Sequence, residues 1–113
     1  MGAPNNLIKA PPFQVEMTLR KLGRNLRLAR IRRKQTIKEA SEKIGTGIRA
    51  VRDAESGKAS TGIAVYAALL WLYDLLGPLE DLADPQKDKE GLALAAGNEN
   101  LRARRSGGLD NDF

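Results

Sequence analysis

The chain has 113 residues, a length that fits one domain with tails. It contains no cysteine and no histidine, which excludes a disulfide framework, a thiolate zinc site and a Ser-His-Asp triad. Lysine and arginine number 19 against 14 acidic residues, a formal net charge of +5. We therefore expect a binding protein with an acidic partner, most commonly nucleic acid, and neither an enzyme nor a protein with a cofactor or metal.

The charges are distributed unevenly along the chain. Segment 18–34 carries eight basic side chains and no acidic one, whereas segment 74–91 carries six acidic side chains against Lys87 and Lys89. We interpret the acidic stretch at 80–90 as a solvated linker, with repulsion of DNA or contact with a basic partner as the alternatives.

Neither secretion nor membrane insertion is indicated by the sequence. The first residues lack an apolar run with a basic flank. The longest nearly apolar stretch, 63–76, is 14 residues long, too short to span a bilayer. We expect a cytoplasmic protein with no membrane partner.

The N-terminal segment 1–17 contains Pro4, Pro11 and Pro12 and is interpreted as an extended arm. Apolar and polar residues alternate over 13–17, which favours a short extended piece. From Thr18 the apolar residues repeat with a helical period, which predicts a helix over 18–33.

Two short helices are predicted next. Thr36 and Glu39 have the spacing of a capping box, which predicts a helix over 36–43. Gly45 ends that helix, and Gly57 follows a second helix over 47–54. A pair of short helices joined by a tight glycine-containing turn is the helix-turn-helix pattern of DNA-binding domains.

A fourth helix is predicted to be apolar on nearly all sides over 63–76. Such a helix buries two faces, so a second chain or a covering segment is required. We predict a homodimer seam, with a single core beneath the N-terminal arm as the alternative. The residues predicted to form the homodimer seam are Trp71, Tyr73, Leu75 and Leu79. A short turn over 79–83 follows. Glycine and asparagine recur among scattered charges after 85 (Gly91, Gly97, Asn98, Asn100), so 85–113 is expected to be a largely flexible tail with a weak helix near 92–96.

Run 36–58, TIKEASEKIGTGIRAVRDAESGK, resembles the Cro/lambda-repressor (XRE) family. The matching positions are Thr36, Glu39, Ser41, Ile44, Gly45, Val51 and Glu55-Ser56-Gly57-Lys58. The resemblance covers about 18–77 and implies an all-α, five-helix lambda-repressor-like domain. The expected organisation is an arm at 1–17, a DNA-binding domain at 18–84 and a tail at 85–113. It also implies a structural ion pair between Arg30 and Glu55.

A narrower resemblance links LGRNLRLARIRRKQT, ALLWLYDLLGPLEDLADP and a late Arg-x-Arg-Arg to HipB-type antitoxins. It implies an autoregulating repressor that binds a palindromic operator as a dimer and holds a HipA-like kinase toxin. The alternative is a protein-interaction module that neutralises a toxin or other partner with little DNA binding.

The resemblance places DNA contacts on the second short helix and around it. The expected base contacts are Gly47, Ile48, Arg49, Arg52 and Asp53. The expected phosphate contacts are Arg24, Arg27, Thr36, Lys38, Thr46, Lys58 and Ser60. The alternative is a solvated face with an Arg49–Asp53 pair, and capping alone accounts for Thr36.

The chain departs from the family pattern at the front of both short helices. Ile37 stands where a phosphate-contacting Gln is common, and Gly47 and Ile48 stand where polar base-reading side chains are frequent. Arg49 and Arg52 are therefore expected to carry more of the readout, with Ile48 contacting a thymine methyl.

Overall fold

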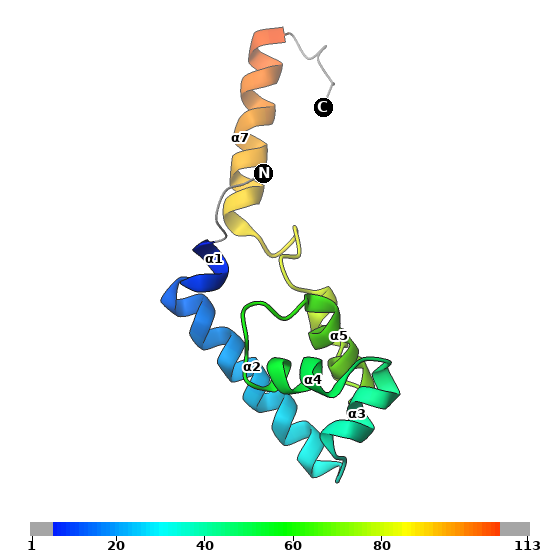
Figure 1. The fold of residues 1–113 in the computed structure, drawn as a ribbon. Coiled ribbons are helices and arrows are strands. Elements are labelled where there is room, and N and C mark those ends of the chain that lie inside the picture. The colour runs from blue at the N-terminus through cyan, green and yellow to red at the C-terminus, as the bar shows by residue number, and fades with distance from the viewer. Residues whose placement is uncertain (1–5, 107–113) are drawn as a thin grey trace. The chain divides into compact units, whose positions relative to one another are not determined.

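The computed structural model describes residues 6–106, which fold into helices joined by turns (Figure 1). Over this range the helices are α1 (Asn6–Lys9), α2 (Phe13–Arg32), α3 (Ile37–Ile44), α4 (Ile48–Glu55), α5 (Ile63–Leu72), α6 (Gly77–Glu80) and α7 (Lys89–Ser106). The prediction of an all-α fold is confirmed. No helix within the described range has the length and apolar character needed to cross a bilayer.

The chain divides into two compact units after Gly77, and α6 spans their boundary. The predicted boundary at 17 lies inside α2, within the first unit, and the predicted boundary at 84 lies within the second unit. The parts of the predicted arm and tail at 1–5 and 107–113 lie outside the described residues.

The expected extended arm is wrong within the described residues. Residues 6–9 form α1, and α2 already begins at Phe13, five residues before the predicted start. Pro12 precedes the first turn of α2, where an absent N–H costs nothing. Glu16 pairs with Arg20 at 2.9 Å, one helical turn away. The alternation over 13–17 was misleading because Phe13, Val15 and Met17 are all exposed and share no buried face.

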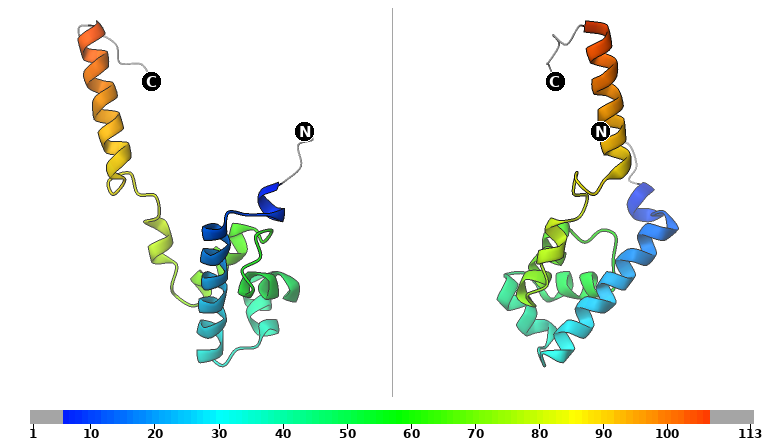
Figure 2. Two further views of the ribbon diagram at one scale, coloured as in Figure 1. Left: turned by 90° about the vertical axis from the view of Figure 1, so that its left-hand side faces the viewer. Right: turned by 180° about the vertical axis from the view of Figure 1, so that it is seen from behind.

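α4 is the central element of the first unit, since it contacts α2, α3 and α5. Figure 2 shows α3 and α4 on one side of the straight α2. Helices α2 to α5 and the residue following α5 supply the buried apolar core. Its members are Leu26, Ala29, Ala40, Val51, Ala54, Tyr66, Leu69 and Tyr73.

Local chemistry sets both the start of α3 and the turn between α3 and α4. The Thr36 hydroxyl accepts the Glu39 backbone N–H at 3.0 Å, and the Glu39 carboxylate accepts the Thr36 N–H at 2.8 Å. Gly45 ends α3 in the left-handed region with φ 80°. The Thr46 N–H donates to the Ser41 carbonyl at 2.9 Å. The observed bounds of both helices lie within one residue of the prediction.

Helix α5 is shorter than predicted and ends at Leu72. Asp74 takes a left-handed conformation with φ 61°, and the Leu75 N–H returns to the Leu70 carbonyl at 2.7 Å. This hydrogen bond terminates the helix. The apolar residues after Leu72 therefore lie outside α5.

In the second unit, the predicted weak helix near 92–96 is instead the 18-residue α7. The Asp88 carboxylate accepts the Gly91 N–H at 3.0 Å and so caps the helix. Glu90 lies near its N-terminus and Arg104 near its C-terminus, where each suits the helix dipole. Gly97, Asn98 and Asn100, which suggested a flexible segment, are accommodated within this helix.

The crossing of α2 and α4 depends on Gly23. A Cβ at this position would lie 2.5 Å from the Glu55 carbonyl oxygen and 2.6 Å from that of Ala54. Both are backbone atoms, so relief requires the two helices to separate. The Gly57 backbone approaches α2 equally closely at Arg20.

We predict that Gly23→Ala lowers the free energy of unfolding by about 1–3 kcal/mol or more, as expected for overpacking. The matched control is Gly62→Ala, because a Cβ at Gly62 meets open space and should cost less than about 1 kcal/mol at this helix N-cap. Urea denaturation of both variants measures the difference. Equal costs would contradict the proposed steric role of Gly23.

Candidate nucleic-acid interface

Helix α4 has one buried and one exposed face. Val51 and Ala54 are fully buried, whereas Arg49 and Arg52 are exposed and Ile48 keeps 39% of its surface accessible. Gly47 is the N-cap residue and provides no side-chain cap. The first turn of α4 therefore presents backbone N–H groups without a side-chain cap beside an apolar and a cationic side chain, a combination suited to a nucleic acid.

Asp53 and Lys58, predicted as a base and a phosphate contact, lie together in the structure. The Asp53 carboxylate is 3.9 Å from the Lys58 ammonium group, and the Lys58 backbone N–H donates to the Asp53 carbonyl at 3.0 Å. Lys58 thus partly neutralises the one acidic side chain among the predicted base contacts.

The predicted ion pair between Arg30 and Glu55 is present. Arg30 Nε donates to Glu55 Oε2 at 2.7 Å and Nη2 donates to Oε1 at 3.1 Å. The two side chains are only 10% and 6% exposed. Hydrogen bonding to the Glu55 carboxylate raises the pKa of the Arg30 guanidinium. A third donor, Nη1, binds the Gln35 carbonyl at 2.8 Å, so one side chain joins α2, the entry to α3 and the end of α4.

The remaining predicted phosphate contacts lie at helix starts, in turns and on α2. Thr36 caps α3, and its N–H lowers the pKa of Glu39 by binding that carboxylate. Lys38 is exposed in the first turn of α3, Thr46 is half-buried between α3 and α4, and Ser60 is exposed before α5. Arg24 and Arg27 are exposed on α2.

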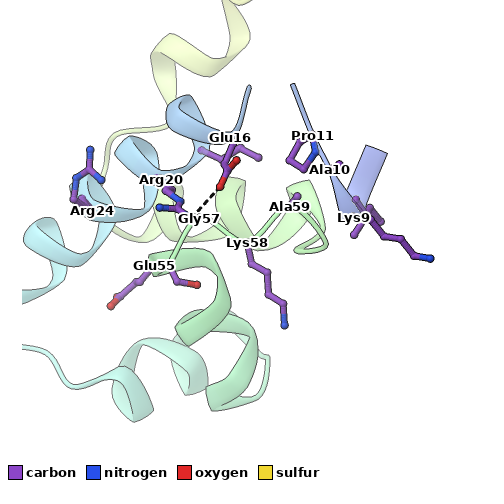
Figure 3. Close-up of a pocket in the computed structure, with 13 residues that line it drawn as sticks. Lys9, Ala10, Pro11, Glu16, Arg20, Arg24, Glu55, Gly57, Lys58 and Ala59 are labelled. Atoms are coloured by element: carbon purple, nitrogen blue, oxygen red, sulfur yellow. Dashed lines mark hydrogen bonds and ion pairs between the residues drawn. The ribbon is translucent and has the colours of Figure 1, made fainter. Parts of the chain in front are cut away.

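A cationic groove of about 630 Å³ lies between α1, the first half of α2 and the loop after α4 (Figure 3). We define it by its basic residues, Lys9, Arg20, Arg24 and Lys58. Its acidic residues are both ion-paired, Glu16 with Arg20 and Glu55 with Arg30. In Figure 3 the charged ends of Lys9, Arg24 and Lys58 point outward at the rim. The groove is therefore suited to an anionic partner.

Sequence reasoning missed Lys9 and Arg20 as members of this groove. An extended arm has no fixed position, so no local signal placed Lys9 beside the loop at Lys58. Arg27, one turn beyond Arg24, does not line the groove.

The predicted dimer residues separate into three groups. Tyr73 is only 1% exposed and belongs to the core, so its assignment to a dimer seam is wrong. The Arg33 guanidinium donates to the Tyr73 carbonyl at 3.0 Å and lies 5.3 Å from the centroid of the Tyr73 ring. Trp71 and Leu75 are 62% and 45% exposed, whereas Leu79 lies in α6, within the second unit.

Leu28 of α2 extends the exposed apolar surface near Leu75. Both residues line a small groove of about 290 Å³ together with Asn25, Ala29, Arg32 and Arg33. Sequence reasoning missed Leu28, because it lies beside the apolar stripe of α2 among basic residues.

Within residues 6–106 no three acidic side chains are grouped so that they could hold a metal ion. Comparison of the chain with protein families, curated proteins and solved structures finds no match.

We predict that Glu55→Ala lowers the free energy of unfolding by about 3–5 kcal/mol, because it leaves the buried Arg30 charge uncompensated. The control is Glu16→Ala, which breaks an exposed pair with Arg20 and should cost less than about 1 kcal/mol. Thermal and urea unfolding provide both values. A small loss for Glu55→Ala would show that the buried pair does not hold α4 in place.

Proposed function

We propose that the protein is a sequence-specific double-stranded DNA-binding repressor with a lambda-repressor-like helix-turn-helix domain. The observation that carries this proposal is the two-faced α4. Its buried residues, Val51 and Ala54, anchor it in the core, while Arg49 and Arg52 remain exposed. A helix anchored along one face and cationic along the other can enter the major groove.

Base recognition is assigned to three outward side chains of α4. Arg49 and Arg52 can each donate two hydrogen bonds to guanine, and Ile48 can contact a thymine methyl. Gly47 contributes backbone rather than side-chain contact, since it has no Cβ. Asp53 has a smaller part in recognition, because its carboxylate lies beside Lys58.

Phosphate contacts fix the register of the protein on the duplex. Thr36, Lys38, Thr46 and Ser60 supply them at helix starts and turns, and the cationic groove extends them along α2 toward α1. The net charge of +5 favours association with DNA at long range.

A homodimer would present two copies of α4 to an inverted repeat, with their centres about 34–36 Å apart. The exposed Trp71, Leu75 and Leu28 are the proposed contact of the first unit, and Leu79 is a further candidate in the second. The resemblance to HipB-type antitoxins extends this proposal to control of its own operon and to a HipA-like kinase toxin as partner.

The second candidate function is neutralisation of a protein partner with little DNA binding. Ile37 favours it, because this apolar residue packs against the core at a position where a polar phosphate contact would strengthen DNA binding. Binding of a DNA duplex by the full chain distinguishes the two functions, because only the repressor requires it.

We predict that Arg49→Ala and Arg52→Ala each weaken binding to a duplex selected from a random pool. The expected loss is about 1–3 kcal/mol each, roughly five- to 150-fold in Kd. Fluorescence anisotropy measures it, with Lys21→Ala on α2 as a charge-matched control outside α4 and the cationic groove. If the pool yields no bound sequence, the second function is favoured. If both arginine variants bind normally, the assigned base contacts are wrong.

We also predict that Lys9→Ala, Arg24→Ala and Lys58→Ala each lower the salt dependence of DNA binding. Each lost phosphate contact should reduce the slope of log K against log salt by about 1 and weaken all sequences similarly. Lys21→Ala should leave the slope almost unchanged. An unchanged slope in the three groove variants would exclude the cationic groove from the DNA interface.

A further inference from the structure

Helix α7 exposes apolar side chains along its length. Leu92, Leu94 and Leu101 are all exposed, and no residue from Lys89 to Arg104 is buried. Helices in folded proteins gain most of their stability from the packing of an apolar face and less from helix propensity. The exposed leucines of this capped helix are therefore available for packing against a partner.

One face of α7 carries a regular stripe. Its members are Glu90, Leu94, Gly97, Leu101 and Arg104. They are separated by four, three, four and three residues, the spacing that keeps side chains in line along one helix face. We call this set the α7 stripe.

The α7 stripe is self-complementary when one copy is reversed. Gly97 is at its centre, a leucine stands on each side, and opposite charges stand at the two ends. In an antiparallel pair Glu90 lies near Arg104 of the partner subunit, and Leu94 lies near Leu101 of the partner subunit. A parallel pair would instead place Glu90 beside Glu90 and Arg104 beside Arg104.

Gly97 and the helix dipoles favour the same antiparallel arrangement. A Cβ at Gly97 would meet open space, so a second backbone can approach closely at the centre of the stripe. Antiparallel helices also bring the positive end of each dipole near the negative end of the other.

We propose that α7 binds α7 of a second copy of this chain, antiparallel, along the α7 stripe. The contact is isologous and follows a two-fold axis through Gly97. It is independent of DNA binding, and it is a second attachment between copies beside the proposed contact of Trp71 and Leu75. Two attachments on one chain strengthen association through effective concentration.

Charge reversal on the full chain tests the arrangement. Glu90→Arg places a second cation against Arg104 of the partner subunit, and Arg104→Glu places a second carboxylate against Glu90 of the partner subunit. Each single variant changes two symmetry-related pairs and should weaken self-association by roughly tenfold in sedimentation equilibrium. The double variant restores both pairs and should associate clearly more tightly than either single variant, although its reversed charges oppose the helix dipole and lower its association below the original value. Glu99→Arg, on the other side of α7, is the control and should have no effect.

Disulfide trapping gives a second measurement, which the absence of native cysteine makes unambiguous. A tagged Glu90→Cys chain is mixed with an untagged Arg104→Cys chain under mild oxidation. The expected product is the mixed disulfide, formed well above the level seen when Glu99→Cys replaces either chain. Cross-links within each variant alone, or none above the control, would overturn the proposal. So would a double charge variant as weak as the single ones. Neither result would alter the DNA-binding assignment of Arg49 and Arg52.

Discussion

The buried ion pair between Arg30 and Glu55 is the interaction on which the remaining geometry depends. It joins residues 25 positions apart through two hydrogen bonds of 2.7 and 3.1 Å, and a third donor of Arg30 binds the Gln35 carbonyl just before α3. Removing either partner leaves an uncompensated charge out of water. The pair thereby fixes the end of α4 to the end of α2, and the close approaches at Gly23 and Gly57 leave little freedom for another crossing.

This arrangement separates the basic residues into two roles. Arg30 acts inside the protein as a structural cross-link. Arg49 and Arg52 on α4, and the rim of the cationic groove, remain in solvent. The same residue type thus stabilises the fold where it is paired and supplies the positive field where it is exposed. The proposed repressor function uses the second role, but its interface is in place only because of the first.

The helix pair α3–α4 could be predicted closely from the sequence, because its signals are local. Thr36 and Glu39 cap α3, and Gly45 ends it in a conformation that favours glycine. The pairing of Arg30 with Glu55 was different in kind, since no local rule joins residues so far apart. It followed from the resemblance to a known family.

The errors arose where local patterns had more than one physical outcome. Alternation over 13–17 indicated a strand-like arm, but those side chains face solvent within α2. Tyr73 belonged to a run that was apolar on all sides, so the pattern could not distinguish core from interface. In the structure Tyr73 is buried in the core. The next residue, Asp74, takes a left-handed conformation, in which a helix cannot continue. Glycine and asparagine near 97–100 suggested flexibility, whereas the Asp88 cap begins a long α7.

We propose that the Arg30–Glu55 pair holds α4 so that its cationic face can meet DNA. Amide NMR of the isotope-labelled full chain, titrated with a duplex selected for binding, tests it most directly. The largest shift changes are expected over residues 47–53, with smaller changes at Lys9 and Lys58, and little change in the buried half of α2. Shifts that spare α4 while other surfaces respond would contradict it.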